Sequence, residues 1–376
     1  MRNTNIPKVR FKQFKDLWNE NKIRNIVSIS AGEDIDRSKL KNKGKYPVIA
    51  NALTNKGIVG FYDDYKVKAP AVTVTGRGDV GYAVARHENF TPVVRLLTLQ
   101  SENIDVDYLE NQINSMRILN ESTGVPQLTA PQLGNYKVYH PEIDEQSAIG
   151  SLFRTLDDLL ASYKDNLANY QYLKATMLSK MFPKAGHTVP EIRLDGFEDE
   201  WEEKEFSKLV KRVTQSSDSI SLPKVEFEDI ISGQGKLNKD ISTKFDNRKG
   251  IHFKPGYTLY GKLRPYLNNW LLPKFEGVAL GDFWVFDPNG NDSNFIYYLV
   301  QSNRYQKVAN DTSGTKMPRS DWKSVSTTIF AIPQTIAEQQ AIGAYFSNLD
   351  NLINSHQEKI SQLETLKKKF LQDMFI

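Results

Sequence analysis

The stretch TVTGRGDVGYAVAR contains Gly76, Gly78 and Gly81 at the spacing of a dinucleotide-binding loop. Such a loop follows a strand and opens a helix, whose N-terminal amide groups bind a pyrophosphate. A β-branched run, typical of a strand, does precede Gly76. The residues after Gly81, however, continue the β pattern and show no helical periodicity. The stretch therefore predicts a glycine-rich loop between two strands, which carries Arg77 and Asp79 outward.

Residue types that support catalysis or metal binding do not form a recognisable site elsewhere in the sequence. The five histidines are scattered without the spacing of metal ligands, and the absence of cysteine excludes disulfides, thiol catalysis and thiolate metal sites. Glu202 and Lys204 have the Glu-x-Lys order of some nucleases, but no upstream aspartate stands in a suitable setting, so we interpret them as surface charges. Neither a Walker phosphate-binding loop nor an Asn-Pro-Pro-Tyr motif of amino-methyltransferases is present. We expect a binding protein without catalytic residues or metal ligands.

Length and composition indicate a multidomain globular protein that is slightly basic. The chain has 376 residues, enough for two or three domains with separate cores. Its net charge of +4 and isoelectric point near 8.8 are compatible with a polyanionic partner without requiring one. The N-terminus lacks an apolar segment, and no apolar run reaches membrane-spanning length. We therefore expect a cytoplasmic protein that has no membrane partner.

The chain consists of two copies of one unit. The opening PKVRF at residues 7–11, followed by a tryptophan, recurs as PEIRL at residues 190–194, again followed by a tryptophan. Further on, EQSAIG recurs as EQQAIG, and the correspondence then continues without gaps to a Met-Phe pair near the end of each copy. The glycine loop recurs only as a strand, one glycine and a cation, which argues against pyrophosphate binding. The sequence therefore predicts a tandem duplication, with units of about residues 1–183 and 184–376.

Each copy ends in a long segment with a seven-residue apolar repeat, at residues 145–183 and 338–376. Apolar residues that alternate three and four apart over about five heptads are typical of a coiled-coil helix. Lys174 and Lys367 interrupt the pattern at matching positions. At about 1.5 Å per residue, such a helix is roughly 55 Å long. The predicted seam residues are Ile149, Phe153, Leu156, Leu160, Tyr163, Leu167, Ile342, Phe346, Leu349, Ile353, His356 and Ile360.

Two such helices in one chain bury their apolar seams best against each other. If a pseudo-twofold axis relates the two copies, the helices pair antiparallel and act as a spacer between globular domains. In the alternative, each helix packs back on its own domain, and the strict seven-residue repeat is then unnecessary. The expected fold is α+β, with two tandem mixed α/β domains, each followed by a long helix, and with the two helices forming an antiparallel coiled coil.

Basic and amide side chains near predicted loops of the two globular domains are candidates for DNA binding. Arginine and lysine suit phosphates and guanine edges, and asparagine suits adenine edges. Most surface cations are simply solvated, so it is the arrangement in two similar domains that favours a binding role. The candidates are Lys39, Lys41, Lys43, Lys45, Asn51, Asn55, Arg77, Arg86, Lys236, Lys239, Lys262, Arg264, Asn268, Lys316 and Arg319.

In these features the chain resembles the DNA specificity (S) subunit of type I restriction-modification enzymes. The resemblance covers nearly the whole chain and rests on the two openings, the helix starts EQ-x-AIG and the helix ends ML-x-x-MF and FL-x-x-MF. It also rests on GYTLYGKLRPYL at residues 256–267 and SGTKMPRSDW at residues 313–322. The first copy departs from the second of these segments, because residues 124–128 occupy its place without its cations.

The resemblance implies two target recognition domains, at residues 1–144 and 184–337, which each contact one half of a bipartite sequence in double-stranded DNA. The helices at residues 145–183 and 338–376 would then form the spacer that fixes the gap between the halves. It further implies docking of two modification subunits, which bind S-adenosylmethionine, and of restriction subunits, which use ATP and magnesium. The chain itself would be non-catalytic and would hold no cofactor.

Three other functions are compatible with parts of the pattern. One is a free-standing sequence-specific DNA binder, which needs no apolar side chains outside the helix seam. A scaffold on which other subunits dock does expose such side chains. The candidates for them are Leu152, Leu159, Tyr172 and Leu173. An enzyme of another class needs a catalytic site that the sequence does not show. A purely structural coiled-coil protein does not need two elaborate globular domains.

Overall fold

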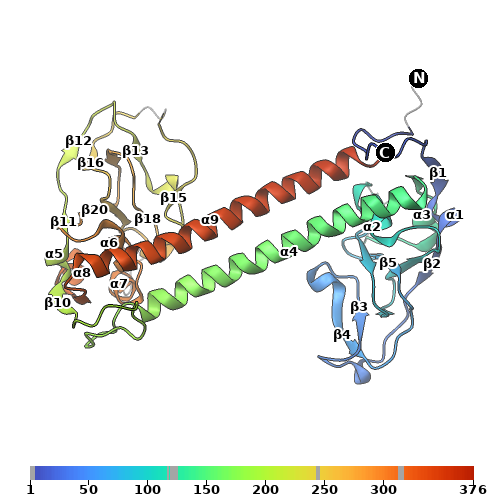
Figure 1. Ribbon diagram of the computed structural model, residues 1–376, viewed down its shortest axis with the longest axis horizontal. Helices are drawn as coiled ribbons and strands as arrows, with labels where there is room; N and C mark the ends of the chain where they lie inside the picture. Colours follow the sequence, from blue (N-terminus) through green and yellow to red (C-terminus); the bar gives the residue numbers. More distant parts are fainter. Residues whose placement is uncertain (1–4, 117, 119–125, 243–245, 312–316) are drawn as a thin grey trace. The chain divides into compact units, whose positions relative to one another are not determined.

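The computed structural model describes residues 5–116, 118, 126–242, 246–311 and 317–376. The chain divides into two compact units, whose elements are labelled in Figure 1. The first unit comprises Met1–Asp165 together with Glu358–Ile376, and the second unit comprises Asn166–Gln357. Each unit therefore contains one globular part, the beginning of one long helix and the end of the other.

The globular part of the first unit contains a four-stranded sheet, a three-stranded sheet and a separate strand pair. The four-stranded sheet has the order β2-β8-β5-β6 with antiparallel neighbours, and the three-stranded sheet has the order β4-β3-β7. The strands are β1 (Asn19–Lys22), β2 (Ser28–Ala31), β3 (Tyr46–Ile49), β4 (Ile58–Tyr62), β5 (Ala71–Val74), β6 (Ala83–Arg86), β7 (Thr91–Pro92), β8 (Leu97–Gln100) and β9 (Lys137–His140). The helices are α1 (Ile23–Ile26), α2 (Val106–Ser115), α3 (Ala130–Gly134) and the 3₁₀ turns η1 (Arg37–Lys39) and η2 (Thr54–Gly57).

The globular part of the second unit contains two four-stranded sheets and two strand pairs. The sheets have the orders β11-β20-β17-β18 and β12-β16-β19-β13. The strands are β10 (Glu202–Glu205), β11 (Lys211–Arg212), β12 (Ser216–Ser217), β13 (Lys224–Val225), β14 (Ile230–Ile231), β15 (Lys236–Leu237), β16 (Gly250–Phe253), β17 (Thr258–Gly261), β18 (Trp270–Leu271), β19 (Gly277–Ala279), β20 (Phe283–Asp287) and β21 (Ile329–Ile332). The helices are α5 (Phe206–Leu209), α6 (Ser293–Leu299), α7 (Asn303–Ala309), α8 (Trp322–Thr327) and the 3₁₀ turns η3 (Phe227–Asp229) and η4 (Pro265–Leu267).

The two units share one topology. The pairs β1–β9 and β10–β21 are both antiparallel and open and close their globular parts. The order β2-β8-β5-β6 corresponds strand by strand, in chain order, to β11-β20-β17-β18. Asp105 caps α2 by accepting a hydrogen bond from the Tyr108 amide, and Asp292 caps α6 in the same way through the Phe295 amide. The predicted duplication of a mixed α/β domain is therefore confirmed.

The hydrophobic cores differ in composition between the units. In the first unit, aliphatic side chains such as Val72 and Leu99 fill the space between the four-stranded sheet and α2. In the second unit the core is largely aromatic, and the Phe206 ring centroid lies 5.1 Å from that of Tyr305 and 5.2 Å from that of Phe286. Full burial of each such side chain stabilises the fold by about 1.5–3 kcal/mol.

The glycine-rich stretch forms the loop between β5 and β6, as predicted. The two strands pair antiparallel over their whole length. Gly78 and Gly81 have φ angles of 77° and 86°, which glycine adopts without steric cost. A strand, β6, follows the loop at the point where a dinucleotide-binding loop leads into a helix, so the arrangement is not that of a pyrophosphate site. Arg77 is exposed at the loop, also as predicted.

Two long helices, α4 (Ile143–Lys180) and α9 (Ile336–Asp373), contain 38 residues each. In the first unit, the beginning of α4 lies against the end of α9: the ring centroids of Phe153 and Phe375 are 5.6 Å apart, and Lys367 Nζ lies 2.5 Å from Asp157 Oδ1. The residue numbers rise along α4 as they fall along α9. The two helices are therefore antiparallel in this unit.

In the second unit, the end of α4 lies against the beginning of α9 with the same polarity. The ring centroids of Tyr170 and His356 are 5.1 Å apart, and Lys174 Nζ lies 2.7 Å from Asp350 Oδ1. The helices contact each other in both units, so the alternative in which each helix packs only on its own domain is wrong. Most predicted seam residues are buried, namely Ile149, Phe153, Leu156, Leu160, Ile342, Phe346, Leu349 and Ile360. The others, Tyr163, Leu167, Ile353 and His356, are half-buried.

Candidate nucleic-acid interface and helix junctions

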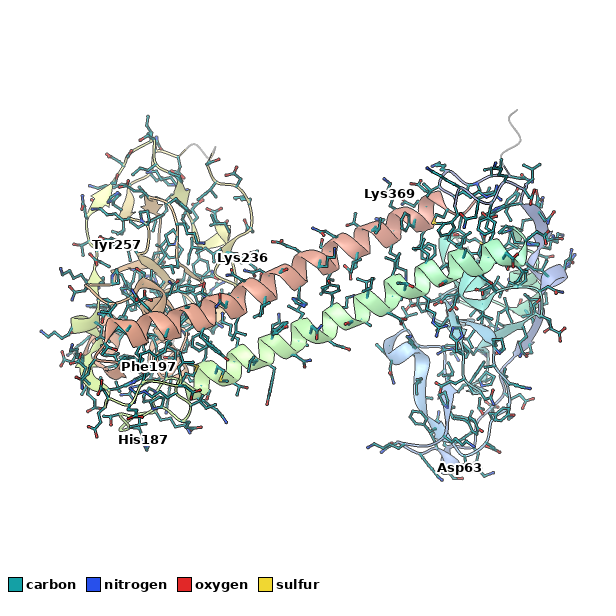
Figure 2. The ribbon with its side chains drawn as sticks, in the orientation of Figure 1. Asp63, His187, Phe197, Lys236, Tyr257 and Lys369 are labelled. Atoms are coloured by element: carbon teal, nitrogen blue, oxygen red, sulfur yellow. The ribbon has the colours of Figure 1, made fainter. Side chains whose placement is uncertain are left out.

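A group of exposed lysines precedes β3 in the first unit. Lys39, Lys41, Lys43 and Lys45 all lie at the surface. Lys41 Nζ lies 2.6 Å from a carboxylate oxygen of Asp63, which is itself exposed (Figure 2). An exposed ion pair of this kind contributes about 0–1 kcal/mol. The lysines are therefore available to phosphate groups, because replacing the Asp63 carboxylate costs little.

Asn51 supports the β5–β6 loop, and its amide group is not free for base recognition. Its Oδ1 accepts a hydrogen bond from the Gly76 amide at 2.8 Å, and its Nδ2 donates to the Val94 carbonyl at 3.1 Å. Both ends of the side-chain amide are thus engaged in holding the loop. Arg77, at the tip of this loop, forms a backbone β-bridge with Gln127. The structure assigns Asn51 the role of positioning the loop that carries Arg77.

Arg86 corrects the sequence-based assignment, because its side chain lies inside the first unit. The residue is 8% exposed, its Nε donates to Thr73 Oγ1 at 2.9 Å, and its Nη2 donates to the Lys56 carbonyl at 2.7 Å. Burial lowers the pKa of Arg86 to about 10. Arg86 therefore ties β6 to β5 and to η2, and the surface position expected for it from the sequence is wrong.

Asn55 and Asn268 occupy left-handed backbone positions, with φ angles of 50° and 55°. Asparagine tolerates this conformation better than most residues. Asn268 ends the 3₁₀ turn η4, and Asn55 lies within η2, where its Nδ2 donates to the Ile58 carbonyl at 3.4 Å. Both residues thus set the path of a turn.

The described parts of the two segments that carry the family resemblance in the second unit lie side by side, although they are far apart in sequence. Leu263 and Arg319 form an antiparallel β-bridge. The Ser320 amide donates to the Lys262 carbonyl at 2.9 Å, and the Arg264 amide donates to the Pro318 carbonyl at 2.7 Å. These bonds bring several candidate side chains onto one surface. We call it the second-unit patch, and it consists of Lys262, Arg264, Tyr266, Met317 and Arg319.

The second-unit patch combines cations with exposed apolar groups around one carboxylate. Arg319 Nη2 lies 2.8 Å from Asp282 Oδ2, and Lys262 Nζ lies 3.7 Å from Asp282 Oδ1. Tyr266 and Met317 are 57% and 55% exposed. Base edges and sugar carbons offer matching polar and apolar groups. The patch therefore has the chemistry of a groove-contacting surface.

Arg264 has a left-handed backbone with φ of 47° and ψ of 60°, just before Pro265 in η4. Such a conformation in a residue other than glycine costs on the order of 1–2 kcal/mol. Strained backbone of this kind is often found where a side chain is held in a functional position. Arg264 is exposed, so its guanidinium group projects from the patch toward solvent.

The remaining candidates of the second unit differ in their surroundings. Lys239 Nζ lies 2.9 Å from Asp229 Oδ1, and Asp229 is 1% exposed, so Lys239 compensates a buried carboxylate. Lys236 lies half-buried in β15 (Figure 2). Lys316 lies outside the described residues.

A buried ion pair joins each globular part to the start of its long helix. In the first unit, Arg10 Nε and Nη2 donate to the two carboxylate oxygens of Glu145 at 2.6 and 2.7 Å, and Trp18 Nε1 donates to the same group at 3.3 Å. Glu145 is 2% exposed. The hydrogen bonds with Glu145 raise the pKa of Arg10. The bidentate geometry explains why an arginine, a tryptophan and a glutamate occur at these positions.

The second unit repeats this junction. Arg193 Nε and Nη2 donate to Glu338 at 2.7 and 2.8 Å, and Trp201 Nε1 donates to Glu338 at 3.0 Å. Glu338 is also 2% exposed. Removing one partner of such a pair leaves an uncompensated buried charge, at a cost of about 3–5 kcal/mol. Sequence analysis found these residues as repeat markers but assigned them no role; their duplication at matched positions was the available signal.

The glutamine that follows each junction glutamate binds the loop before the capped helix. Gln146 accepts from the Asp105 amide at 3.1 Å and donates to the Pro141 carbonyl at 2.8 Å. Gln339 accepts from the Asp292 amide at 3.0 Å in the same manner. The Glu-Gln pair therefore fixes the first turn of each long helix to two different segments of its globular part.

Comparison with known proteins places the chain among DNA specificity proteins. The sequence model of the family described as "Type I restriction modification DNA specificity domain" matches residues 15–170 and 232–365, more than half of the chain. This chain belongs to that family. The two matched segments fall one in each copy of the duplication, although each also extends into a long helix.

Relatives and solved structures agree with this membership. A protein of Mycoplasma pneumoniae named as a type I specificity subunit is 26% identical over 116 residues, and the match covers 31% of this chain and 31% of the relative. A second such protein of M. pneumoniae is 27% identical over 144 residues, which cover 36% of this chain and 47% of the relative. The matches thus span less than half of either relative. The crystal structure of the S subunit of a type I restriction-modification system from M. genitalium superposes with a TM-score of 0.71 at 15% identity and covers 99% of both chains. That likeness shows the fold.

The described residues lack two other kinds of site. They contain no cluster of three or more histidine, aspartate or glutamate side chains that could hold a metal ion. None of the helices in the same residues is long and apolar enough to cross a membrane.

Proposed function

We propose that this chain is the specificity subunit of a type I restriction-modification complex and that each unit recognises one half of a bipartite sequence in double-stranded DNA. The duplicated Arg–Glu–Trp junction carries the proposal, because it fixes a separate surface domain rigidly to each long helix. Membership of the DNA specificity family supports the choice of DNA as the ligand. The proposal includes two recognition domains, at residues 1–144 and 184–337. One long helix follows each of these domains.

In the second unit, the proposed DNA contacts are centred on the second-unit patch. Arg264, Lys262 and Arg319 supply the cations, and Asp282 orients two of them. In the first unit, Arg77 and the lysines of residues 39–45 have the corresponding role. Each arginine that donates two hydrogen bonds to a guanine contributes about 1–3 kcal/mol of discrimination, whereas the lysines supply affinity without sequence preference.

The two long helices act in this proposal as an antiparallel coiled-coil spacer. A helix of 38 residues is about 57 Å long, which matches roughly 17 base pairs of DNA. The antiparallel contacts within each unit support this arrangement. The seam would then fix the number of unspecified base pairs between the two half-sites.

We further propose that the chain is non-catalytic and recruits its catalytic partners: two modification subunits that bind S-adenosylmethionine, and ATP-dependent restriction subunits in the cytoplasm. Apolar side chains outside the helix seam support a docking role. Leu159 and Tyr172 are 42% and 76% exposed on α4, whereas Leu152 and Leu173, the other two off-seam candidates, pack against the cores. A free-standing DNA binder would have no use for the exposed pair.

The proposal is tested by mapping methylated bases in host DNA with and without this chain, in cells that also express the modification subunit. We expect a methylated two-part motif with a fixed unspecified gap that disappears when the chain is deleted. An unchanged methylation map, in cells where the modification subunit is active with another specificity subunit, would instead favour the free-standing DNA binder.

A further inference from the structure

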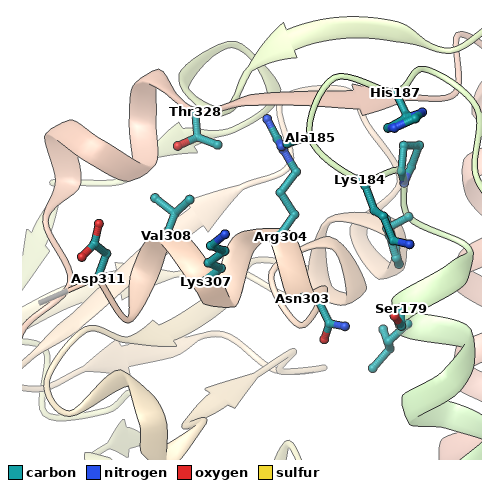
Figure 3. Close-up of a pocket in the computed structure, with 13 residues that line it drawn as sticks. Ser179, Lys184, Ala185, His187, Asn303, Arg304, Lys307, Val308, Asp311 and Thr328 are labelled. Carbon is teal, nitrogen blue, oxygen red and sulfur yellow. The ribbon is translucent and has the colours of Figure 1, made fainter.

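The second unit has a pocket of about 620 Å³ where the end of α4 meets α7. In Figure 3, α7 carries Asn303 and Lys307 along one wall, Asp311 follows the end of this helix, and Ser179 marks the end of α4. The segment that follows α4 forms a third wall and contributes His187. The helix seam, the Arg–Glu–Trp junction and the second-unit patch contribute no residue to this pocket, so it lies outside the sites described above.

The pocket combines apolar walls with basic groups. Leu178, Phe182 and Val308 supply apolar surface. Among the basic lining residues, Lys184 forms an ion pair with Glu191. The side chain of Lys307 is exposed and forms no ion pair with any described residue. A ligand that enters along the apolar wall therefore meets an ammonium group that has no ion-pair partner among the described residues, although the Asp311 carboxylate also lines the pocket.

Arg304, the other cation of this pocket, is held by the fold. Its Nε donates to the Ile329 carbonyl at 2.8 Å, and its guanidinium carbon lies 5.5 Å from the ring centroid of Phe330. Neither the carbonyl nor the ring carries a negative charge, so these two contacts do not neutralise the positive charge of Arg304. Arg304 thus adds to the positive potential of the pocket while keeping its wall rigid.

The first unit has a pocket of about 490 Å³ at the corresponding place. Leu371 and Phe375 line it, and they match Leu178 and Phe182 in the duplicated helix ends ML-x-x-MF and FL-x-x-MF. The end of α2 supplies the opposite wall, as α7 does in the second unit. Lys368 is exposed at this pocket, and no aspartate or glutamate side chain lines it among the described residues.

We infer that the two pockets bind the same segment of a protein partner present in two copies, and that this segment places an apolar side chain beside a carboxylate. The matched leucine and phenylalanine accommodate the apolar side chain, and the rim lysines, Lys307 and Lys368, attract the carboxylate. Nucleic acid fits less well, because a phosphate backbone needs a row of cations along an open groove. This inference rests on the proposed function, in which the partner is the modification subunit.

The test uses the full chain and the purified modification subunit, with complex mass measured by size-exclusion chromatography and light scattering. The unmodified chain should bind two copies. Lys307→Glu places a carboxylate where the partner's carboxylate binds, so it should weaken one copy on the order of tenfold to a hundredfold and leave a complex with one copy. Lys368→Glu should remove the other copy, and the double variant should remove both.

Matched controls make the same charge change outside the pockets. Lys323→Glu, on α8 of the second unit, and Lys359→Glu, on α9, alter exposed lysines that line neither pocket. Both controls should keep two bound copies, and all variants should melt within a few degrees of the unmodified chain.

Three results would count against this account, and they are distinguishable. If the double variant binds two copies as tightly as the unmodified chain, the pockets are not the docking sites. If the variants keep both copies but bind duplex DNA more weakly than the controls do, the pockets face nucleic acid and the inference is overturned. If the unmodified chain binds no modification subunit, the proposed function itself is wrong.

Discussion

The two units keep the same supports and present different surfaces. At the junction, Arg10 and Glu145 have the same bidentate geometry as Arg193 and Glu338. At the loop after the central strand, the first unit pairs Arg77 with Gln127, whereas the second pairs Leu263 with Arg319 and adds neighbouring cations. A duplicated chain that keeps its framework and changes one surface is expected to recognise two different ligands of one class. This contrast supports the proposal that those surfaces select sequence.

The helix pair also differs between the units in how firmly it is tied to the globular part. In the second unit, Asp350 pairs with Lys174 and accepts a hydrogen bond from the Tyr298 hydroxyl at 2.8 Å. Tyr298 and Asn111 occupy equivalent positions, because each is the sixth residue after the aspartate that caps its helix. Asn111 cannot replace the tyrosine contact, since its side-chain amide donates a hydrogen bond to the Asp107 carbonyl within its own helix. The polar contact is therefore better enclosed in the second unit.

The largest expected effect is at the two junctions. Glu145→Gln and Glu338→Gln each leave an arginine, whose side chain is 10% or 16% exposed, without its counter-charge, so each should destabilise its unit by about 3–5 kcal/mol. Because the junction geometry is shared, the two losses should be similar. Urea denaturation would measure them, with the exposed Glu142→Gln as the control. A loss in one unit and not in the other would show that the two junctions are not equivalent supports.

Substitution of the two seam lysines should destabilise the two units by different amounts. Lys174 and Asp350 have side chains that are 14% and 22% exposed, against 27% and 42% for Lys367 and Asp157. Lys174→Ala should cost about 1.5–3 kcal/mol, as expected for an enclosed hydrogen bond between charged groups. Lys367→Ala should cost less than about 1 kcal/mol.

A charge exchange provides the control for the seam prediction. The variant with Lys174→Asp and Asp350→Lys together should recover part of the stability that Lys174→Asp loses alone, because the ion pair is restored with reversed polarity. Thermal unfolding of the two variants would show the difference. Equal melting temperatures would mean that the ion pair itself contributes nothing to the seam.

DNA recognition should respond to each unit independently. Arg264→Ala should weaken binding by about 1–3 kcal/mol and relax only one half of the motif, and Arg77→Ala should relax only the other half. Arg86→Lys serves as a contrast, because Arg86 is buried and should affect stability more than sequence preference. The measurement is affinity for duplexes with each half-site altered in turn. Relaxation of both halves by a single arginine change would mean that the units do not recognise DNA separately.

A further effect concerns pH and the first unit alone. Burial, with a contribution from Asp157, raises the pKa of Glu110 to about 7, above its value of about 4.3 in unfolded chains. Between these values the folded state binds more protons than the unfolded state, so the stability of the first unit should fall as pH rises from about 5 to 7. Tyr297 takes this position in the second unit, and burial raises its pKa. It therefore stays uncharged in the same range.

Glu110→Gln should flatten this pH dependence while leaving the second unit unaffected. Melting curves of the variant and the unmodified chain at pH 5 and pH 8 would show whether it does. Parallel pH profiles for the two proteins would show that Glu110 is ionised in both the folded and unfolded states across this range.

The sequence predicted the architecture well because its signals were periodic or duplicated. The seven-residue repeat predicted both long helices, and the β run on each side of Gly76 predicted a hairpin. The pairing of Lys174 with Asp350 could not be predicted, since the lysine stood out only as an interruption of the seam. Asp350 can be recognised as the partner of Lys174 only from the antiparallel register of α4 and α9.

Individual site residues were harder to predict, for a physical reason. Whether a polar side chain faces solvent or the core depends on strand register, which a short strand does not reveal. Arg86 was therefore assigned to the surface, although it lies on the inner face of β6. Asn51 was likewise taken for a possible base contact, although its amide is used within the loop. The bridge between Leu263 and Arg319 and the backbone hydrogen bonds beside it show that two distant segments build one patch, which the sequence order does not reveal.

The most direct test of the central claim is long-read methylation mapping of cells that express the modification subunit with the unmodified chain, and then with Arg264→Ala. The account predicts a two-part motif with a fixed gap, and predicts that the variant relaxes bases in one half while the other half and the gap stay the same. A single undivided motif, or simultaneous changes in both halves, would contradict the claim that each unit recognises its own half-site.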